Sequence, residues 1–427
     1  MERTPAVRTG GRLTVVQGAA LYVGAVLGTG VIALPALAAA VAGPASLVAW
    51  AALVLLSIPV AATFAALGAR YPDAGGVATY VRHAFGSRAG TVVGWCFFLA
   101  VPPGASAAAT FAGTYVAAAF GGGRATVVGT AVALMVVVTV TNASGVRLTG
   151  RVQVLLAGLL VALLLAAVVA AVPRARVANL HPFAPHGWLA VGSAAALLVW
   201  SFAGWEAITH LAADFRRPAR DLPRATGVAV AVVGLLYLAV AAASVLVLGP
   251  AAGRTGAPLA ELLARGAGGR AAVVAAVAAV LLTLGTMNAY YAGAAKLAAA
   301  LGRDGGLPEW FARGSAAGET PRRGLAVVAG LGVVGFAATT GAGIGAAPLV
   351  LLTTGCFVTV YALGVAAALR LLPRRTGAYR LAWVAMVAVT GLAVATGPYL
   401  VWPVLVAAAA LTYHRIRRRR RHGGATG

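Results

Sequence analysis

Long runs of apolar residues recur along almost the whole chain. A helix needs about 20 apolar residues to cross the hydrocarbon core of a bilayer, and hydropathy along the sequence identifies twelve such runs. Only 10% of the residues are charged, far below the share usual in soluble domains. We therefore expect an all-α integral membrane protein with twelve transmembrane helices, near residues 14–40, 44–68, 88–118, 125–145, 151–172, 188–213, 225–249, 272–301, 324–341, 346–370, 380–396 and 398–414.

The predicted loops leave no room for a soluble domain. The longest, at residues 173–187, 250–271 and 302–323, have about twenty residues each. We expect one membrane domain over residues 1–427, made of two five-helix halves, two further helices and a basic tail: residues 14–172, 188–370, 380–414 and 415–427.

The chain is strongly basic, but the charge is unevenly distributed. A net charge of +24 would suggest nucleic-acid binding in a soluble protein. With twelve spans and the N-terminus inside, all but six of the 33 Arg and Lys residues fall on the cytoplasmic side. This is the asymmetry of membrane proteins, so we expect both termini in the cytoplasm, the lipid bilayer of the inner (plasma) membrane as partner, and no nucleic acid. Arg417–Arg421 is interpreted as a topology anchor, with docking on anionic lipid as the alternative.

Two of the apolar runs are interrupted at mid-span. The first contains three glycines within Gly24–Gly30, and the sixth contains Gly204 beside Glu206. Glycine weakens a helix because it loses more conformational freedom than other residues. Spans one and six hold equivalent positions in the two halves, and such paired interruptions indicate an inverted-repeat transporter with its site near the bilayer midplane. We expect a five-plus-five fold in which helices 1 and 6 are broken.

A broken helix exposes backbone groups that suit the two charged ends of an amino acid. The N–H groups of residues 29–32 would begin the second half of span one, where the positive end of the helix dipole favours a carboxylate. The carbonyls that end the preceding half-helices suit an ammonium. The predicted substrate-binding residues are Val26, Gly28, Thr29, Gly30, Val31, Ser201, Phe202, Ala203 and Gly204. The alternative for Gly28–Gly30 is close packing of helices through small residues.

Glu206 is a carboxylate within an apolar span, which needs a compensating role. Glu206, His210 and Asp214 lie at i, i+4 and i+8, so they share one helix face. Our hypothesis is proton coupling, in which Glu206 is protonated in one transport state and deprotonated in the other. Alternatively, Glu206 stays neutral and bonds the unwound backbone of span one, while His210 and Asp214 pair with nearby arginines.

Several further residues are predicted to gate or line the site. Aromatic side chains in the sixth span could cover an apolar substrate, although aromatics in spans also face lipid or pack in the core. A proline pair in the third span predicts a kink beside the site. The predicted gate and lining residues are Trp200, Trp205, Pro103, Thr353 and Phe357.

At these residues the chain resembles the amino acid-polyamine-organocation (APC) superfamily. Gly28–Ile32 is similar to the superfamily's Gly-Ser-Gly-hydrophobic-aromatic element, with Thr29 for serine and Ile32 where an aromatic is frequent. Phe202–Glu206 is similar to its aromatic-x-Gly-x-Glu pattern. The resemblance covers nearly the whole chain and implies the five-plus-five inverted-repeat fold.

Further segments resemble a branch of this superfamily that exports apolar amino acids. They are Leu34–Leu37, Tyr71–Ala78, Glu206–Ala212, Asp214–Phe215 and Pro218–Ala225. The resemblance implies export of methionine, leucine, isoleucine or valine by proton antiport. An importer or exchanger of the same fold, and a non-transporting amino acid sensor, remain as alternatives, as do a monomer and a homodimer.

Catalytic and metal sites have no sequence support. The chain lacks a phosphate-binding Gly-x-x-x-x-Gly-Lys loop and a zinc-type His/Cys cluster. Cys96 and Cys356 lie inside predicted spans and are interpreted as packing residues. Sodium coupling would need paired hydroxyls on span eight, and Thr283, Thr286 and Asn288 supply no adjacent pair. We therefore expect no enzyme activity, no metal and no cofactor, with a proton gradient as the driving force.

Overall fold

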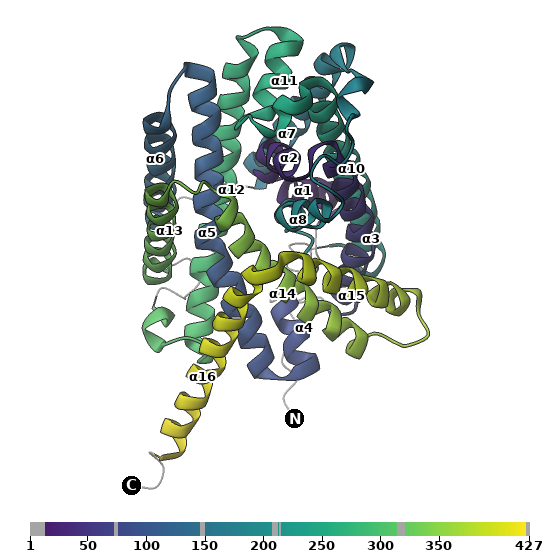
Figure 1. The fold of residues 1–427 in the computed structure, drawn as a ribbon. Helices are drawn as coiled ribbons and strands as arrows, with labels where there is room; N and C mark the ends of the chain where they lie inside the picture. The colour runs from purple at the N-terminus through teal and green to yellow at the C-terminus, as the bar shows by residue number, and fades with distance from the viewer. Residues whose placement is uncertain are drawn as a thin grey trace.

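The computed structural model describes residues 13–71, 76–145, 150–206, 212, 215–313 and 321–423. This part of the chain is helical, and its extended pairing is limited to an isolated bridge between Leu13 and Phe215. The helices run mostly along one direction and lie side by side (Figure 1). The last helix, at residues 401–423, runs toward the bottom of that view.

The two halves of the chain contribute similar sets of helices. The first contains α1 (Val15–Val26), α2 (Gly30–Ala42), α3 (Ser46–Arg70), α4 (Gly76–Phe85), α5 (Ser87–Phe120), α6 (Arg124–Ala143) and α7 (Gly150–Ala171). The second contains α8 (Leu189–Leu198), the 3-10 helix η4 (Val199–Phe202), α10 (Pro218–Ala243), α11 (Pro258–Ala267), α12 (Ala271–Asp304), α13 (Arg322–Ala342) and α14 (Ala347–Leu371). The last two helices are α15 (Gly377–Thr396) and α16 (Val401–Gly423).

The helices are long and apolar enough to cross a membrane repeatedly. Among the described residues, nine helical stretches meet that description. Two of these stretches, Gly30–Arg70 and Gly377–Arg417, each join two helices. Val15–Val26 and Leu189–Phe202 are shorter apolar helices. The chain is therefore a multi-pass membrane protein, as the hydropathy pattern predicts.

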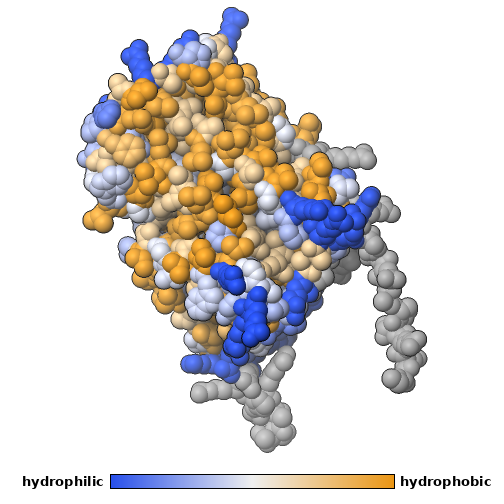
Figure 2. All heavy atoms as spheres, turned by 90° about the vertical axis from the view of Figure 1, so that its right-hand side faces the viewer, coloured by the Kyte–Doolittle hydropathy of each residue, from blue (hydrophilic) through white to orange (hydrophobic). Residues whose placement is uncertain are grey.

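The surface has the polarity of a protein embedded in lipid. Apolar side chains cover the middle of the face in Figure 2, and hydrophilic ones gather toward its top and bottom. Large apolar residues are exposed on several outer helices, among them Leu55, Val136, Leu235 and Val387. A soluble protein seldom exposes so continuous an apolar surface. This belt therefore marks the height at which the bilayer surrounds the bundle.

The centre of the bundle is built on α5 and α12, which have 34 residues each. A helix of that length extends about 51 Å, well beyond the hydrocarbon core of about 30 Å. Polar side chains bond across to neighbouring helices: Asn142 on α6 donates to Asn288 on α12 at 2.7 Å. The Ser106 hydroxyl on α5 lies 2.7 Å from the Gly332 carbonyl on α13. These bonds satisfy polar groups that lipid could not solvate.

Candidate functional site: two broken helices and a central cavity

The helix of the first span is interrupted between Val26 and Gly30. α1 ends at Val26, and α2 begins at Gly30 after the non-helical residues 27–29, here called the first break. Thr29 stands at the N-cap position of α2, but its side chain makes no capping bond and is only 2% exposed. The first N–H groups of any α-helix lack partners within the helix and carry its positive dipole end. The first break therefore presents a buried site suited to an anion.

In the segment predicted as the sixth span, the helix ends at Phe202. α8 tightens into η4, and the chain then leaves the helix over residues 203–206, here called the second break. Gly204 has φ of +125°, a conformation that residues with a side chain rarely adopt. A Cβ at Gly204 would also stand 3.0 Å from the carbonyl oxygen of Ala25. Both the backbone conformation and the close approach require glycine here.

The two breaks lie against one another. Ala25 and Val26 of α1 contact the second break at Gly204. On the other side, a Cβ added to Gly30 would stand only 2.5 Å from the Oγ of Ser201 and 3.0 Å from its Cα. Glycines at Gly30 and Gly204 thus let two backbones approach where ordinary side chains would hold them apart. The predicted substrate-binding residues are brought together at this crossing.

Tyrosine hydroxyls bond the carbonyls that the breaks leave open. Tyr22 donates to the Trp205 carbonyl at 2.6 Å. The Tyr237 hydroxyl lies 2.6 Å from the Ser201 carbonyl and 2.8 Å from that of Val26, so it links both spans. Unpaired carbonyls at this depth would each cost several kcal/mol. The broken backbone is therefore stabilised by donors from α1 and α10, which the sequence prediction did not include.

Glu206 closes the second break. Its side chain is 4% exposed, and its Oε2 accepts from the backbone N–H of Gly204 at 2.9 Å and from the Tyr361 hydroxyl at 2.6 Å. Tyr361 lies on α14, and its hydroxyl is also 3.1 Å from the Phe202 carbonyl. The carboxylate is thus linked to the backbone of its own span. His210 and Asp214, predicted to continue a proton path, lie outside the described residues.

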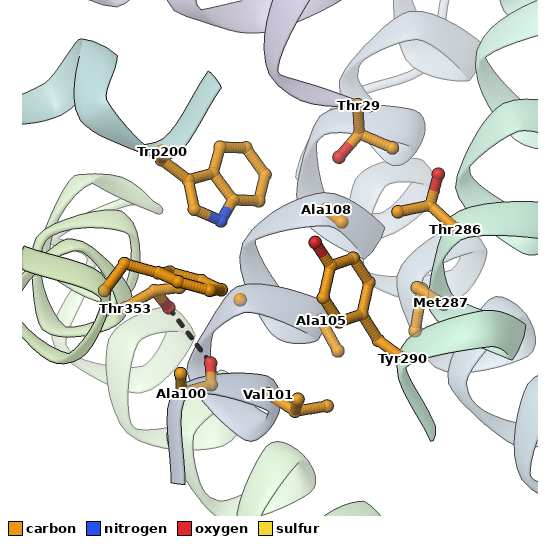
Figure 3. A pocket seen from close by; sticks show the side chains of 12 residues that line it. Thr29, Ala100, Val101, Ala105, Ala108, Trp200, Thr286, Met287, Tyr290 and Thr353 are labelled. Atoms are coloured by element: carbon orange, nitrogen blue, oxygen red, sulfur yellow. Dashed lines mark hydrogen bonds between the residues drawn. The ribbon is translucent and has the colours of Figure 1, made fainter. Parts of the chain in front are cut away.

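A cavity lies beside the first break, between the breaks and the central helices (Figure 3). Its empty space, counting the part that is open to solvent, amounts to about 360 Å³. Among the described residues, no charged side chain lines it. The lining residues are Thr29, Ala100, Val101, Gly104, Ala105, Ala108, Trp200, Thr286, Met287, Tyr290, Thr353 and Phe357.

Four of the predicted site residues line this cavity: Thr29, Trp200, Thr353 and Phe357. The Thr353 hydroxyl is engaged with the carbonyls of Leu349 and Ala100, at 2.9 and 3.2 Å. Pro103 lies inside α5, and its neighbour Gly104 reaches the cavity instead. The other predicted residues of the two spans do not line the cavity, and they form or flank the two breaks: Val26, Gly28, Gly30, Val31, Ser201, Phe202, Ala203, Gly204, Trp205 and Glu206.

Phe202 and Trp205 pack against aromatic neighbours. The Phe202 ring meets the Tyr237 ring edge-on, with centroids 5.0 Å apart, and also lies 6.1 Å from Trp50. The Trp205 ring meets Tyr22 at 5.1 Å. Edge-to-face contacts of this kind favour packing. In this conformation, Trp200 is the aromatic of the sixth span that faces the cavity.

Sequence reasoning missed the walls that α5 and α12 supply. Ala100, Val101, Ala105 and Ala108 form one wall, and Thr286, Met287 and Tyr290 form another. The only available signal was helical spacing, since residues three and four apart share a face. In a continuously apolar span, that spacing does not separate a cavity-facing stripe from ordinary packing.

Sequence comparisons with known proteins identify relatives of this chain among amino acid permeases. The family model for amino acid permeases matches residues 13–415. The uncharacterized amino acid permease YecA of Bacillus subtilis is 33% identical over 405 residues, covering 95% of this chain and 96% of YecA. The L-methionine/branched-chain amino acid exporter YjeH of Escherichia coli is 33% identical over 375 residues, 86% of this chain and 87% of YjeH. The branched-chain amino acid permease BcaP of B. subtilis is 25% identical over 240 residues, 52% of each chain.

These relatives are permeases and transporters rather than enzymes, and the first two match this chain over nearly its full length. Together with the family model, they confirm the resemblance seen at the interrupted spans. The chain belongs to the amino acid permease family of the APC superfamily.

Proposed function

We propose that this protein is a proton-coupled exporter of apolar amino acids, working by alternating access. Its twelve spans would form two inverted five-helix repeats, at residues 14–172 and 188–370, followed by two further helices. α1 with α2 would make one span and α8 with the following segment another, which gives both repeats a broken first helix. The protein would lie in the inner membrane with both termini in the cytoplasm.

The buried, unpaired start of α2 beside an uncharged cavity carries this proposal. The α-carboxylate of a substrate would meet the N–H groups at Gly30, Val31 and Ile32, near the Thr29 hydroxyl. The described residues of the lining offer no charge to pair with an ionised side chain, and such a charge would stay unsolvated there. Methionine, leucine, isoleucine and valine are therefore favoured over arginine or glutamate. The name of YjeH, an exporter of these substrates, agrees.

Glu206 is the proposed proton carrier. When ionised, its Oε2 accepts from Gly204 and Tyr361 at the same time. When protonated, it accepts these bonds more weakly, and Tyr361 can turn toward the Phe202 carbonyl, 3.1 Å away. Proton binding would thereby loosen the second break, which contacts Ala25 and Val26 of the first span. This contact would couple the proton to the substrate site.

Efflux from purified protein in vesicles tests the proposal. Vesicles preloaded with methionine should release it faster when an inwardly directed proton gradient is imposed. Glu206→Gln keeps the side-chain shape but has no proton to release, so it should exchange methionine without responding to the gradient. The matched control is Glu261→Gln on α11, whose side chain is 41% exposed and pairs loosely with Arg265 at 4.0 Å. It should respond like the wild type.

Two results would count against this function. A Glu206→Gln protein that stays fully gradient-dependent removes Glu206 from proton coupling. Wild-type efflux that ignores the gradient but requires an external amino acid identifies an exchanger, the alternative within the same fold.

A further inference from the structure

Three hydroxyl-bearing side chains line the end of the cavity that lies under the first break. Thr29 comes from the start of α2, and Thr286 and Tyr290 come from α12, four residues apart and so on one face. Figure 3 shows the Tyr290 hydroxyl pointing toward the end at which Thr29 and Thr286 lie. No hydrogen bond joins these hydroxyls to another residue in the part of the chain that the structure describes. Among the described residues, these three hydroxyls at one end of the cavity thus have no hydrogen-bond partner.

The hydroxyls lie at the anion-binding end of the site. A Cβ at Gly28 would stand 3.8 Å from Cγ2 of Thr286, so the methyl group of this threonine packs against the first break, beside its hydroxyl. At the opposite end of the cavity, beside Val101, the Thr353 hydroxyl is already bonded to the Ala100 carbonyl (Figure 3). An ammonium would be repelled from the positive end of α2. A carboxylate has two oxygens that together accept about four hydrogen bonds, enough for the helix N-terminus and for further donors.

Resting on the proposed function, we propose that Tyr290 and Thr286 of α12 donate hydrogen bonds to the substrate's α-carboxylate. They are binding residues that complete the anion site begun by α2 and Thr29. This arrangement places the substrate's side chain among Val101, Ala105 and Met287. It also makes the free carboxylate, rather than the side chain, the group that Tyr290 recognises.

Binding measurements with Tyr290→Phe test this inference, because the variant removes the hydroxyl and keeps the ring. Affinities for leucine, methionine and valine should all fall by the same factor, about tenfold for a lost bond to a charged group. Leucinamide lacks the carboxylate, so its weak binding should not change. The preference for leucine over leucinamide should therefore shrink about tenfold. Thr286→Val should act in the same direction, and Thr286→Ser should restore binding.

Tyr291→Phe is the matched control on the same helix. The Tyr291 hydroxyl faces α13, where a Cβ at Gly332 would lie 3.3 Å from it, and Tyr291 does not line the cavity. Its removal should leave every affinity unchanged.

The inference is overturned if Tyr290→Phe binds leucine normally. It is also overturned if the variant alters the ranking of the three amino acids, because that would place Tyr290 against the substrate's side chain. Should Tyr290→Phe fail to fold, the Thr286 variants test the inference in its place: Thr286→Val should weaken leucine binding, and Thr286→Ser should restore it. A wild type that binds no amino acid contradicts the proposed function instead.

Discussion

Single tyrosine hydroxyls stabilise the backbone where the two broken helices cross. Tyr237 reaches the carbonyls of Val26 and Ser201, and Tyr22 reaches that of Trp205. In a soluble protein, water could replace these donors. At bilayer depth no water is available, so the loss of one hydroxyl leaves a carbonyl unpaired. These tyrosines therefore stabilise the protein, and the same hydrogen bonds hold the two breaks in position against one another.

Tyr237→Phe should destabilise the protein. Two carbonyls would lose their shared donor, at a cost of about 1–3 kcal/mol, while the aromatic packing on Trp50 and Phe202 is kept. A lower apparent melting temperature in detergent is the expected result. The control is Tyr291→Phe, whose hydroxyl is buried and has no hydrogen-bond partner among the described residues, so its removal should be neutral or slightly stabilising. Equal melting temperatures for both variants would contradict this role of Tyr237.

The sequence predicts some residues of the site and not others, for a physical reason. Glu206 and Gly204 stand out because a carboxylate and a glycine are unusual within an apolar span. The tyrosines do not, because their partners are distant: Tyr22 and Trp205 are 183 residues apart, and Tyr361 and Glu206 are 155 residues apart. Tyrosine in a span can equally sit at the membrane interface or in the core. Only the folded arrangement assigns their role.

At the scale of elements, the first break follows from its glycines, as predicted, and the sixth helix ends near Gly204. What local sequence does not give is how the two interruptions meet. Gly30 faces Ser201, and Gly204 faces Ala25. Each glycine therefore makes room for the backbone of the neighbouring span as well as shaping its own. Likewise, Thr286 and Tyr290 belong to the cavity only because α12 packs beside the first break. Contacts between helices carry this information, and local patterns do not.

Gly30→Ala should disrupt the crossing of the two breaks. The added methyl would stand 2.5 Å from the Oγ of Ser201 and 3.0 Å from its Cα, and overpacking of this kind costs about 1–3 kcal/mol. Transport should fall about five- to hundredfold, since each 1.4 kcal/mol corresponds to about a factor of ten. Gly330→Ala on α13 is the control, because nothing lies within 4 Å of its added methyl. A Gly30→Ala protein with normal transport would show that the breaks need not touch.

At the scale of the whole molecule, composition and hydropathy are enough to predict a helical, multi-pass membrane protein. The apolar belt of Figure 2 surrounds a bundle whose centre holds an uncharged cavity. The distribution of arginines predicts cytoplasmic termini, and this orientation stays a prediction. The direction of net transport depends on gradients and on the relative energies of the transport states, so neither the sequence nor one conformation specifies it.

The central claim is that an amino acid binds at the crossed breaks and is carried across the membrane. Counterflow tests it most directly: vesicles containing the purified protein and a high internal concentration of unlabelled methionine are diluted into a trace of labelled methionine. We predict transient accumulation of label inside the vesicles, which excess external leucine abolishes and arginine leaves unaffected. Binding of methionine without any accumulation would contradict transport and identify the protein as an amino acid sensor.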